Sequence, residues 1–180
     1  SPQQKSIAVL PFKNLSDSKV DEYFSDGIAD DIRAHLWKIA DLKVISQQSV
    51  MQYKNSNRSI KDIGKDLDVA TILEGSVRRA GNQIRIVAQL IDARDEGHIW
   101  ADTYDRENTN IFSIQSDIAQ KIAVTLEAKL SPLEKEMIAK KPTDNPAAYD
   151  YYLRGRDYYG RYNKQANENP KHVIDYLKRS

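Results

Sequence analysis

The sequence contains no cysteine, and this absence narrows the chemistry that the chain can perform. None of its 180 residues carries a thiol, which excludes disulfides, cysteine nucleophiles and sulfur-ligated metal sites. Proteins of the cytoplasm and of the periplasm both tolerate this composition, so cysteine usage leaves the compartment open. We expect the periplasm, behind a membrane span of a longer protein, in preference to the cytoplasm.

Long hydrophobic runs are missing as well. No stretch approaches the roughly 20 consecutive apolar residues that a membrane helix needs, and the first residues show no signal-peptide pattern. We therefore expect no membrane insertion of this sequence. The chain begins at Ser1 without a methionine and ends at Ser180 within a helical pattern, which indicates a piece of a longer protein.

The sequence also lacks an excess of charge of either sign. It carries 27 basic and 26 acidic side chains, for a formal net charge of +1. This balance gives no overall field that attracts nucleic acid or anionic lipid, and we expect no direct binding of nucleic acid. Hydrophobic residues make up 40% and charged residues 29% of the chain, a composition typical of a globular domain.

Catalytic and metal-binding motifs are absent. There is no glycine-rich phosphate loop and no G-x-S-x-G elbow. The three histidines fall in three different predicted elements without a second ligand at metal-binding spacing: His35, His98 and His172. We predict no catalytic, metal-binding or cofactor-binding residue, and no cofactor.

One cluster of carboxylates needs a separate interpretation. Asp26, Asp30 and Asp31 lie close together in the sequence. They follow the polar side of an amphipathic helical pattern. We interpret them as part of a solvated helix face.

Hydrophobic periodicity predicts an α/β domain that begins near residue 5. Residues 7–10 (IAVL) are continuously apolar, which is typical of a strand buried on both faces. Apolar residues spaced by three and four predict a helix from Phe24 to Ile39. A strand over residues 42–45 follows, and then a short helix over residues 60–67, capped by Ser59. Two strand–helix–strand steps favour parallel pairing of the first three strands.

The second half of this domain is predicted to be an antiparallel meander closed by a helix. Strands over residues 71–79 and 84–92 are joined by a hairpin signal at residues 80–82, and a third strand covers residues 98–104. Helical spacing of apolar residues predicts a long helix over residues 111–130. The fold class is α/β, a two-layer mixed five-stranded sheet in the order β-α-β-α-β-β-β-α with helices packed on it.

A change of composition follows the α/β domain. Prolines and lysines over residues 131–146 predict a linker between residues 5–130 and a helical segment over residues 147–180. This segment is rich in aromatic residues, and a second helix is expected to open near Pro170. The tyrosines are interpreted as packing positions, and exposure of some of them favours self-association of the chain; they are Tyr149, Tyr151, Tyr152, Tyr158 and Tyr159.

Several sequence blocks resemble a known family. They are residues 6–12 (SIAVLPF), 22–27 (EYFSDG), 73–79 (LEGSVRR), 84–92 (IRIVAQLID), 98–106 (HIWADTYDR) and 111–115 (IFSIQ). On these blocks the chain resembles the TolB amino-terminal-like domain of bacterial signalling proteins, which is related to FlgO-type domains. The resemblance implies a sensing or interaction module. It also implies parent proteins that place a class III nucleotide cyclase or a winged-helix DNA-binding domain ahead of this region.

The same resemblance implies tetratricopeptide repeats after the α/β domain. Tyr151, Gly155 and Tyr158 stand at the spacing of the first helix of such a repeat. Arg154 departs from the leucine expected before the glycine. Because one repeat cannot bury its own apolar face, an incomplete repeat implies that more chain follows.

Strand alternation gathers polar residues on one face of the predicted hairpin. The candidate interaction surface comprises Glu74, Arg78, Arg85, Gln89, Trp100 and Tyr104. The simpler interpretation is that charged side chains pair across the strands and stabilise the sheet. The alternative is an open recognition surface, in which the aromatic residues supply contact area and Arg78 a charged anchor. Burial of Trp100 under the final helix or the linker is the slightly favoured alternative to its exposure.

These observations leave two functional hypotheses. The leading one is a non-catalytic sensing or protein-interaction module, which couples binding of a partner or ligand to a cyclase or DNA-binding output domain outside this sequence. The alternative is a small-molecule or nucleotide-binding regulatory domain. Its cleft would lie at the carboxyl ends of the parallel strands, near Asn14, Asp17 and Ser46. An enzyme would need converging titratable groups, and the sequence offers no such cluster.

Overall fold

The chain folds into two compact units, Ser1–Asp144 and Asn145–Ser180. The computed structural model describes residues 5–168, without the side chains of residues 20 and 162–168. The first unit is an α/β fold and the second contains a long helix. The helix predicted near Pro170, together with His172, lies outside the described residues.

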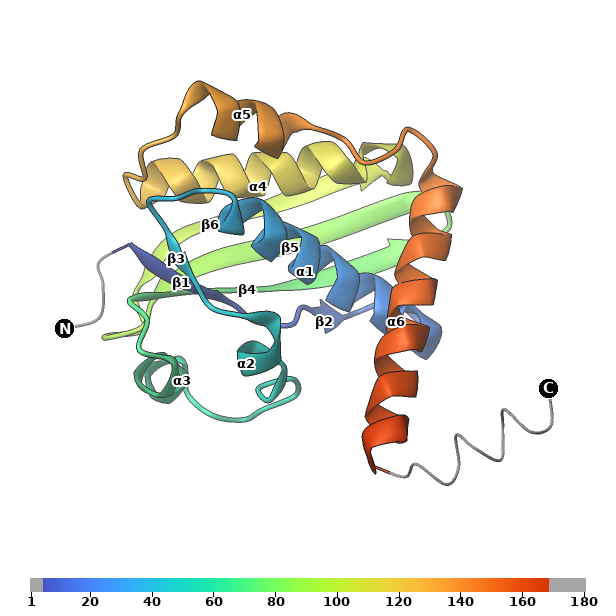
Figure 1. Cartoon of the computed structure of the whole chain (residues 1–180), viewed down its shortest axis with the longest axis horizontal. Coiled ribbons are helices and arrows are strands. Elements are labelled where there is room, and N and C mark those ends of the chain that lie inside the picture. Colours follow the sequence, from blue (N-terminus) through green and yellow to red (C-terminus); the bar gives the residue numbers. More distant parts are fainter. Residues whose placement is uncertain (1–4, 169–180) are drawn as a thin grey trace. The chain divides into compact units, whose positions relative to one another are not determined.

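A mixed sheet forms the centre of the first unit, with the strand order β3-β1-β4-β5-β6 (Figure 1). β1 (Ser6–Val9) pairs in parallel with β3 (Lys43–Val44) and with β4 (Thr71–Ala80). β4, β5 (Gln83–Asp92) and β6 (His98–Glu107) form an antiparallel meander. The mixed five-stranded sheet and its parallel first half are therefore confirmed. All residues of β1 are buried, as expected of a strand covered on both faces.

A further strand, β2 (Lys13–Asn14), pairs in parallel with β4 and is not predicted by the sequence pattern. The Leu10 N–H donates to the Leu73 carbonyl and the Leu15 N–H donates to the Val77 carbonyl, at 2.9 and 2.8 Å. The chain therefore follows β4 beyond the end of β1. Pairing with β4, and not local periodicity, makes these two residues a strand.

Two long helices cover one face of the sheet. α1 (Glu22–Trp37) and α4 (Ile111–Thr125) contact each other and the strands beneath them, and α5 (Pro132–Ala139) packs alongside (Figure 1). Two short 3-10 turns precede these helices, η1 (Lys19–Asp21) and η2 (Asn108–Asn110). The main core lies in this layer, with side chains that exclude solvent almost fully: Phe24, Ile28, Ile32, Ile86, Leu90, Ile114 and Ile118.

Arg79 ties the start of α1 to the end of β4 within this layer. Its guanidinium donates to Asp21 Oδ1 at 2.5 Å and to the Tyr23 hydroxyl at 3.0 Å. The guanidinium carbon also lies 4.3 Å from the centre of the Phe24 ring. Because the side chains of Arg79 and Asp21 are only 15% and 14% exposed, removal of either one leaves a desolvated charge.

Two short helices cover only one end of the opposite sheet face. α2 (Gln47–Met51) and α3 (Ile60–Leu67) enclose a small core of Ala8, Leu10, Val50, Tyr53, Ile63, Val69, Ile72 and Ala93. The predicted cap of α3 is confirmed, because Ser59 Oγ accepts the Asp62 N–H at 3.1 Å. Beyond this core the same face of β4, β5 and β6 is not buried.

α4 ends at Thr125, so the prediction of a helix that continues to Leu130 is wrong. Glu127 adopts a φ of +54°, which takes the chain out of the helix. The Glu127 N–H donates to the Val124 carbonyl at 3.0 Å, and the next residue donates to the carbonyl of residue 123 at 2.8 Å. These two bonds satisfy the last carbonyls of the helix and close it.

The range predicted as a linker contains α5. Ser131 Oγ accepts the Glu134 N–H at 3.2 Å, and Glu134 accepts the Ser131 N–H at 2.7 Å. This reciprocal pair, followed by Pro132, starts a helix. The domain boundaries proposed from the sequence remain predictions.

The second unit is described through α6 (Pro146–Glu168). Asn145 Oδ1 accepts the N–H groups of Ala147 and Ala148 at 3.0 and 3.3 Å and so caps the helix. Several tyrosines of α6 are more than half exposed: Tyr151, Tyr152, Tyr158 and Tyr159. That α6 begins a tetratricopeptide repeat remains a prediction.

Candidate functional site

One face of the antiparallel meander is open to solvent. Along β5, Ile84, Ile86, Ala88 and Leu90 are buried toward the helices, whereas the alternate residues from 85 to 89 are exposed or partly exposed. The strand register aligns these residues with exposed neighbours on β4 and β6. This surface is termed the open sheet face. Its residues are Glu74, Ser76, Arg78, Arg85, Val87, Gln89, Ala101, Thr103 and Asp105.

Side chains of the open sheet face interact across the strands. The Gln89 amide donates to the carboxylate of Glu74, which lies opposite it. The Arg85 guanidinium donates to both carboxylate oxygens of Asp105 at 2.6 and 3.0 Å. The hydrogen bond from Arg85 holds the pKa of Asp105 below its ordinary value. Four of the residues proposed from the sequence, Glu74, Arg78, Arg85 and Gln89, therefore lie together.

Trp100 and Tyr104 lie on the other side of the sheet. They stand opposite Leu90 and Ile86 in the register, so they face the helical layer. Tyr104 is 6% exposed, and its hydroxyl is buried without a hydrogen-bond partner among residues 5–168. Burial, followed by the nearby charge of Asp102, raises the pKa of Tyr104 to about 12. The structure does not bring these aromatic residues to the open sheet face.

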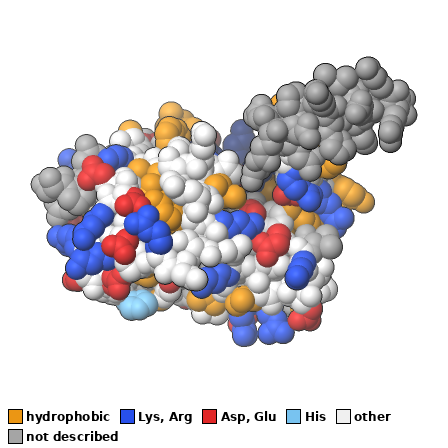
Figure 2. Space-filling view, turned by 90° about the horizontal axis from the view of Figure 1, so that it is seen from below, with side chains coloured by type: hydrophobic (Ala, Val, Ile, Leu, Met, Phe, Trp, Pro, Cys, Tyr) orange, Lys and Arg blue, Asp and Glu red, His pale blue; other side chains and the backbone are white. Residues whose placement is uncertain are grey.

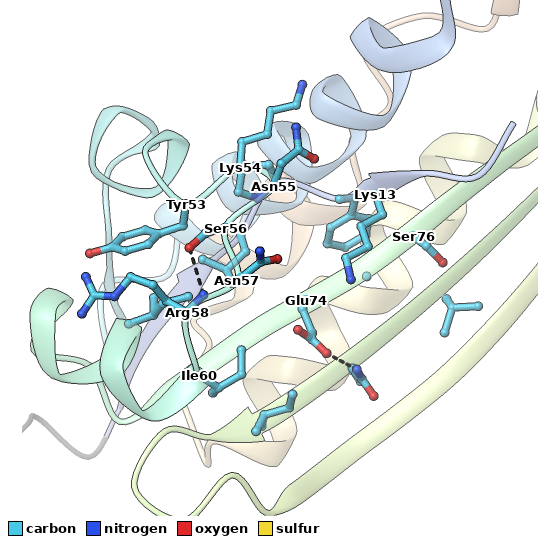
Figure 3. A pocket seen from close by; sticks show the side chains of 18 of the residues that line it. Lys13, Tyr53, Lys54, Asn55, Ser56, Asn57, Arg58, Ile60, Glu74 and Ser76 are labelled. Carbon is cyan, nitrogen blue, oxygen red and sulfur yellow. Dashed lines mark hydrogen bonds between the residues drawn. The ribbon is translucent and has the colours of Figure 1, made fainter. Parts of the chain in front are cut away.

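A cleft of about 810 Å³ adjoins the open sheet face. Residues 53–60, which connect α2 to α3, form its wall (Figure 3). Its floor includes Glu74, Ser76, Val87, Gln89 and Ile91. Figure 3 shows that Lys13 extends over this floor in the direction of Glu74.

Ion pairs fix the wall of the cleft at both ends. Lys54 Nζ lies 2.5 Å from Asp26 Oδ2 of α1. Burial acts to lower the pKa of Lys54, but the hydrogen bond and charge of Asp26 outweigh it and raise the pKa. At the other end, Asp66 of α3 accepts hydrogen bonds from Arg58 and from the Tyr53 hydroxyl. These bonds, that of Arg58 first, lower the pKa of Asp66.

The carboxylates of α1 are less solvated than the sequence suggests. The side chain of Asp30 is 11% exposed and pairs with Arg33 at 2.9 Å. That of Asp26 is 23% exposed and binds Lys54. The interpretation of a solvated face is wrong for these two residues, because the cleft wall and Arg33 cover them.

The cleft predicted for the alternative function includes one of its three predicted residues, Asn14. Asn14 lines the cleft, but its side chain accepts the Ser16 N–H at 2.9 Å and donates to the Ser18 carbonyl at 3.0 Å. Ser46 caps α2 through the N–H of residue 49. Neither Ser46 nor Asp17 lines the cleft.

Metal-ligating groups do not converge in the part of the chain that the structure describes, since no three His, Asp or Glu side chains are placed to hold a metal ion. His98 begins β6 as predicted, and His35 is buried on α1. Burial, followed by the charge of Lys38, lowers the pKa of His35 to about 4. None of the helices within residues 5–168 has the length and apolar character needed to cross a membrane.

Surface charge is mixed in the view from below the molecule. Figure 2 shows acidic and basic side chains interspersed there, with hydrophobic side chains between them. This distribution agrees with the net charge of +1. This surface therefore presents individual charged side chains and not a broad field of one sign.

Lys13 and the wall of the cleft were not predicted as parts of a site. Lys13 belongs to a two-residue strand without any hydrophobic period, and residues 53–60 contain no regular apolar spacing. Their places depend on pairing with β4 and on ion pairs to residues distant in the sequence. The polar cluster of Asn55, Ser56 and Asn57 indicates a loop but not its position.

Comparisons with known proteins relate this chain to bacterial regulators. The family model for the HilA/YgeH-like transcriptional regulator, second domain, matches residues 3–121. The chain is also 43% identical over 155 residues to "Putative adenylate cyclase 3" of Rhizobium meliloti (strain 1021). This match covers 86% of the chain and 26% of the relative, so the chain spans about a quarter of that protein's length.

Two solved structures share the fold. TolB from Acinetobacter baumannii has a TM-score of 0.51 at 14% identity, over 69% of this chain and 28% of that one. Lipoprotein GNA1162 from Neisseria meningitidis has a TM-score of 0.50 at 18% identity, over 66% of this chain and 96% of that one. These likenesses concern the fold alone and confirm the resemblance to the TolB amino-terminal-like domain. On the family match over residues 3–121, the chain belongs to the HilA/YgeH-like transcriptional regulator family and corresponds to its second domain.

Proposed function

We propose that this domain is a non-catalytic sensing and protein-binding module that binds a protein partner on its open sheet face. The observation that carries the proposal is the asymmetry of the meander: one face of β4 and β5 is buried under helices, and the other faces solvent beyond the small core under α2 and α3. Cross-strand bonds already order side chains on the exposed face. Binding of a partner therefore costs little additional side-chain entropy at this surface.

The second part of the proposal is that binding is coupled to an output domain elsewhere in the protein. The family consists of transcriptional regulators, and one relative carries the name of an adenylate cyclase. Since the chain spans 26% of that relative, we assign nucleotide cyclisation or DNA binding to the remainder of such proteins. The domain described here supplies the sensing surface.

Site-specific photo-crosslinking tests where the partner binds. A photoreactive amino acid replaces Thr103 on the open sheet face, and in a matched variant it replaces Lys121, which is exposed on α4. Both are placed in the whole protein in its host cells. We expect a discrete protein adduct from position 103 and none from position 121. Equal adducts at both positions, or an adduct from 121 alone, would contradict the proposal.

The cleft supports a second candidate function, a small-molecule or nucleotide-binding regulatory domain. Its volume of about 810 Å³ lies within the roughly 300–1,000 Å³ of typical ligand pockets. Amides and hydroxyls of Asn55, Ser56 and Asn57 line its wall. A thermal-shift screen of nucleotides and metabolites tests this candidate. Saturating ligand should raise the unfolding temperature of the wild type and not that of Asn57→Leu; an absence of stabilisation across the screen contradicts it.

A further inference from the structure

Two arginines stand directly opposite each other on the open sheet face. Arg78 of β4 pairs with Arg85 of β5 in the strand register. Side chains at such positions lie about 4.5–5.5 Å apart at Cβ, and like charges there destabilise a sheet. A repulsive pair on an exposed surface is relieved when an anion binds beside it.

Only one of these two arginines forms an ion pair within the described residues. Arg85 makes the two-pronged bond to Asp105. Arg78 is exposed and, within residues 5–168, forms no ion pair or hydrogen bond through its side chain. The guanidinium of Arg78 is therefore available to a carboxylate, which it can bind through two parallel hydrogen bonds.

A second available cation lies on the other side of Ser76. Lys13 of β2 is aligned with Ser76 in the parallel register, two residues along β4 from Arg78. It is exposed and likewise has no bonded partner in the described part of the chain. The nearby carboxylates are both engaged, Glu74 by Gln89 and Asp105 by Arg85. Arg78 therefore remains available beside the Ser76 hydroxyl, while Lys13 extends in the direction of Glu74 (Figure 3).

We propose that the open sheet face recognises an acidic segment of its protein partner, with a carboxylate held by Arg78 beside Ser76. This inference rests on the proposed function and specifies the chemistry of the partner. Val87 and Thr103 complete the row that contains Ser76, and Val87 is only partly exposed. We therefore expect the acidic residue of the partner to be flanked by small or aliphatic residues that contact Val87.

The arrangement favours an acidic peptide over nucleic acid. Asp105 and Glu74 lie within the same surface and would repel a continuous row of phosphates. The balance of 27 basic and 26 acidic residues gives no supporting field for a polyanion. A single carboxylate bound by Arg78 avoids both obstacles.

Selection from a random-peptide display library against the whole chain tests the inference. We expect enriched peptides to carry Asp or Glu next to aliphatic residues. Labelled copies of these peptides should bind Arg78→Ala about fivefold and Arg78→Glu at least about tenfold more weakly than the wild type. Lys121→Glu makes the same charge change on α4 and should leave the affinity unchanged.

A charge swap provides the sharpest readout. A peptide in which the selected acid is replaced by lysine should bind Arg78→Glu more tightly than it binds the wild type. The variant is expected to stay folded, because Arg78 is exposed and its replacement removes repulsion with Arg85. Its unfolding temperature should equal or exceed that of the wild type, and a lower one would contradict the like-charge argument.

The outcomes separate this inference from the proposed function. If the selected peptides lack acidic residues but bind Thr103→Arg more weakly than the wild type, the inference of acidic recognition is wrong. The open sheet face then remains the binding surface. Failure to enrich any peptide, or binding that Thr103→Arg leaves intact, would contradict both. Binding of a short labelled DNA duplex that depends on Arg78 would also overturn the inference.

Discussion

Gly64 of α3 packs closely against Ala93, the residue after β5. Moving one methyl group from residue 93 to residue 64 gives a quantitative test of this contact. A Cβ built at residue 64 lies 2.4 Å from Ala93 Cβ, below the 3.0 Å that real Cβ contacts respect. Gly64→Ala must therefore displace α3 or the turn after β5. The double variant Gly64→Ala with Ala93→Gly removes the clash, because the remaining atoms of residue 93 lie at 3.5 and 3.6 Å.

The expected free energies follow from these contacts. Overpacking at Gly64→Ala costs about 2 kcal/mol, and the better helix propensity of alanine returns about 1 kcal/mol. Ala93→Gly loses a buried methyl group and adds backbone freedom, for about 1.5 kcal/mol together. In the double variant, residue 64 of α3 supplies the buried methyl group in place of residue 93. It should unfold within about 0.5 kcal/mol of the wild type, a coupling of about 2 kcal/mol.

Urea unfolding monitored by circular dichroism at one pH measures all four proteins. Gly155→Ala is the control, since a Cβ at that position meets nothing within 4 Å, and it should not destabilise the chain. If the two single losses simply add in the double variant, the close contact between α3 and residue 93 is not the cause and the reasoning fails.

Acidification should destabilise the domain through His35. Its pKa of about 4 in the fold lies below the ordinary 6.5, so the unfolded chain takes up the proton first and stability falls from pH 6.5 to 4, by at most about 1.4 kcal/mol per pH unit. A stability difference between wild type and His35→Gln that does not change with pH would contradict this. At the alkaline end, Tyr104 keeps its proton to about pH 12 against an ordinary 10.0, so its stabilising contribution is full below pH 10 and is lost toward 12. Ultraviolet titration should show a late-ionising tyrosine signal that decreases by one residue in Tyr104→Phe, and an unchanged titration would count against the burial of Tyr104. On the outermost strand, Asp102 Oδ1 accepts the Thr103 N–H at 2.8 Å, and Asp102→Ala should free that edge N–H and promote self-association. Light scattering should then give a larger mass for Asp102→Ala than for the wild type at equal concentration. An equal mass would contradict the idea that Asp102 protects the strand edge.

Strong local patterns predicted the main strands and helices of the sheet correctly, but not β2, α2 or α5. The continuous apolar run of β1 requires burial on both faces, and the structure places it between two parallel partners. Alternation along β5 separates a buried from a polar face without knowledge of its neighbours. The end of α4 was harder, because Glu127 in a left-handed conformation carries no sequence signal comparable to glycine.

Which residues belong to the candidate site depends on how the strands are aligned with one another. Alternation within one strand does not determine this alignment. Tyr104 and Trp100 share a face with each other, but which face they share follows from the alignment of β6 with Ile86 and Leu90. A shift by one residue moves every side chain of a strand to the opposite face. Lys13 joins the site only because residues after β1 continue along β4.

The central claim is that partners bind on the open sheet face. The most direct measurement is an NMR titration of the isotope-labelled chain, monitored through its backbone amide signals. The added ligand is the partner identified by crosslinking, or a selected peptide. We predict chemical-shift changes centred on Ser76, Val87 and Thr103, with the signals of α4 unmoved. Changes centred on α1 and α4, with β4, β5 and β6 silent, would contradict the account.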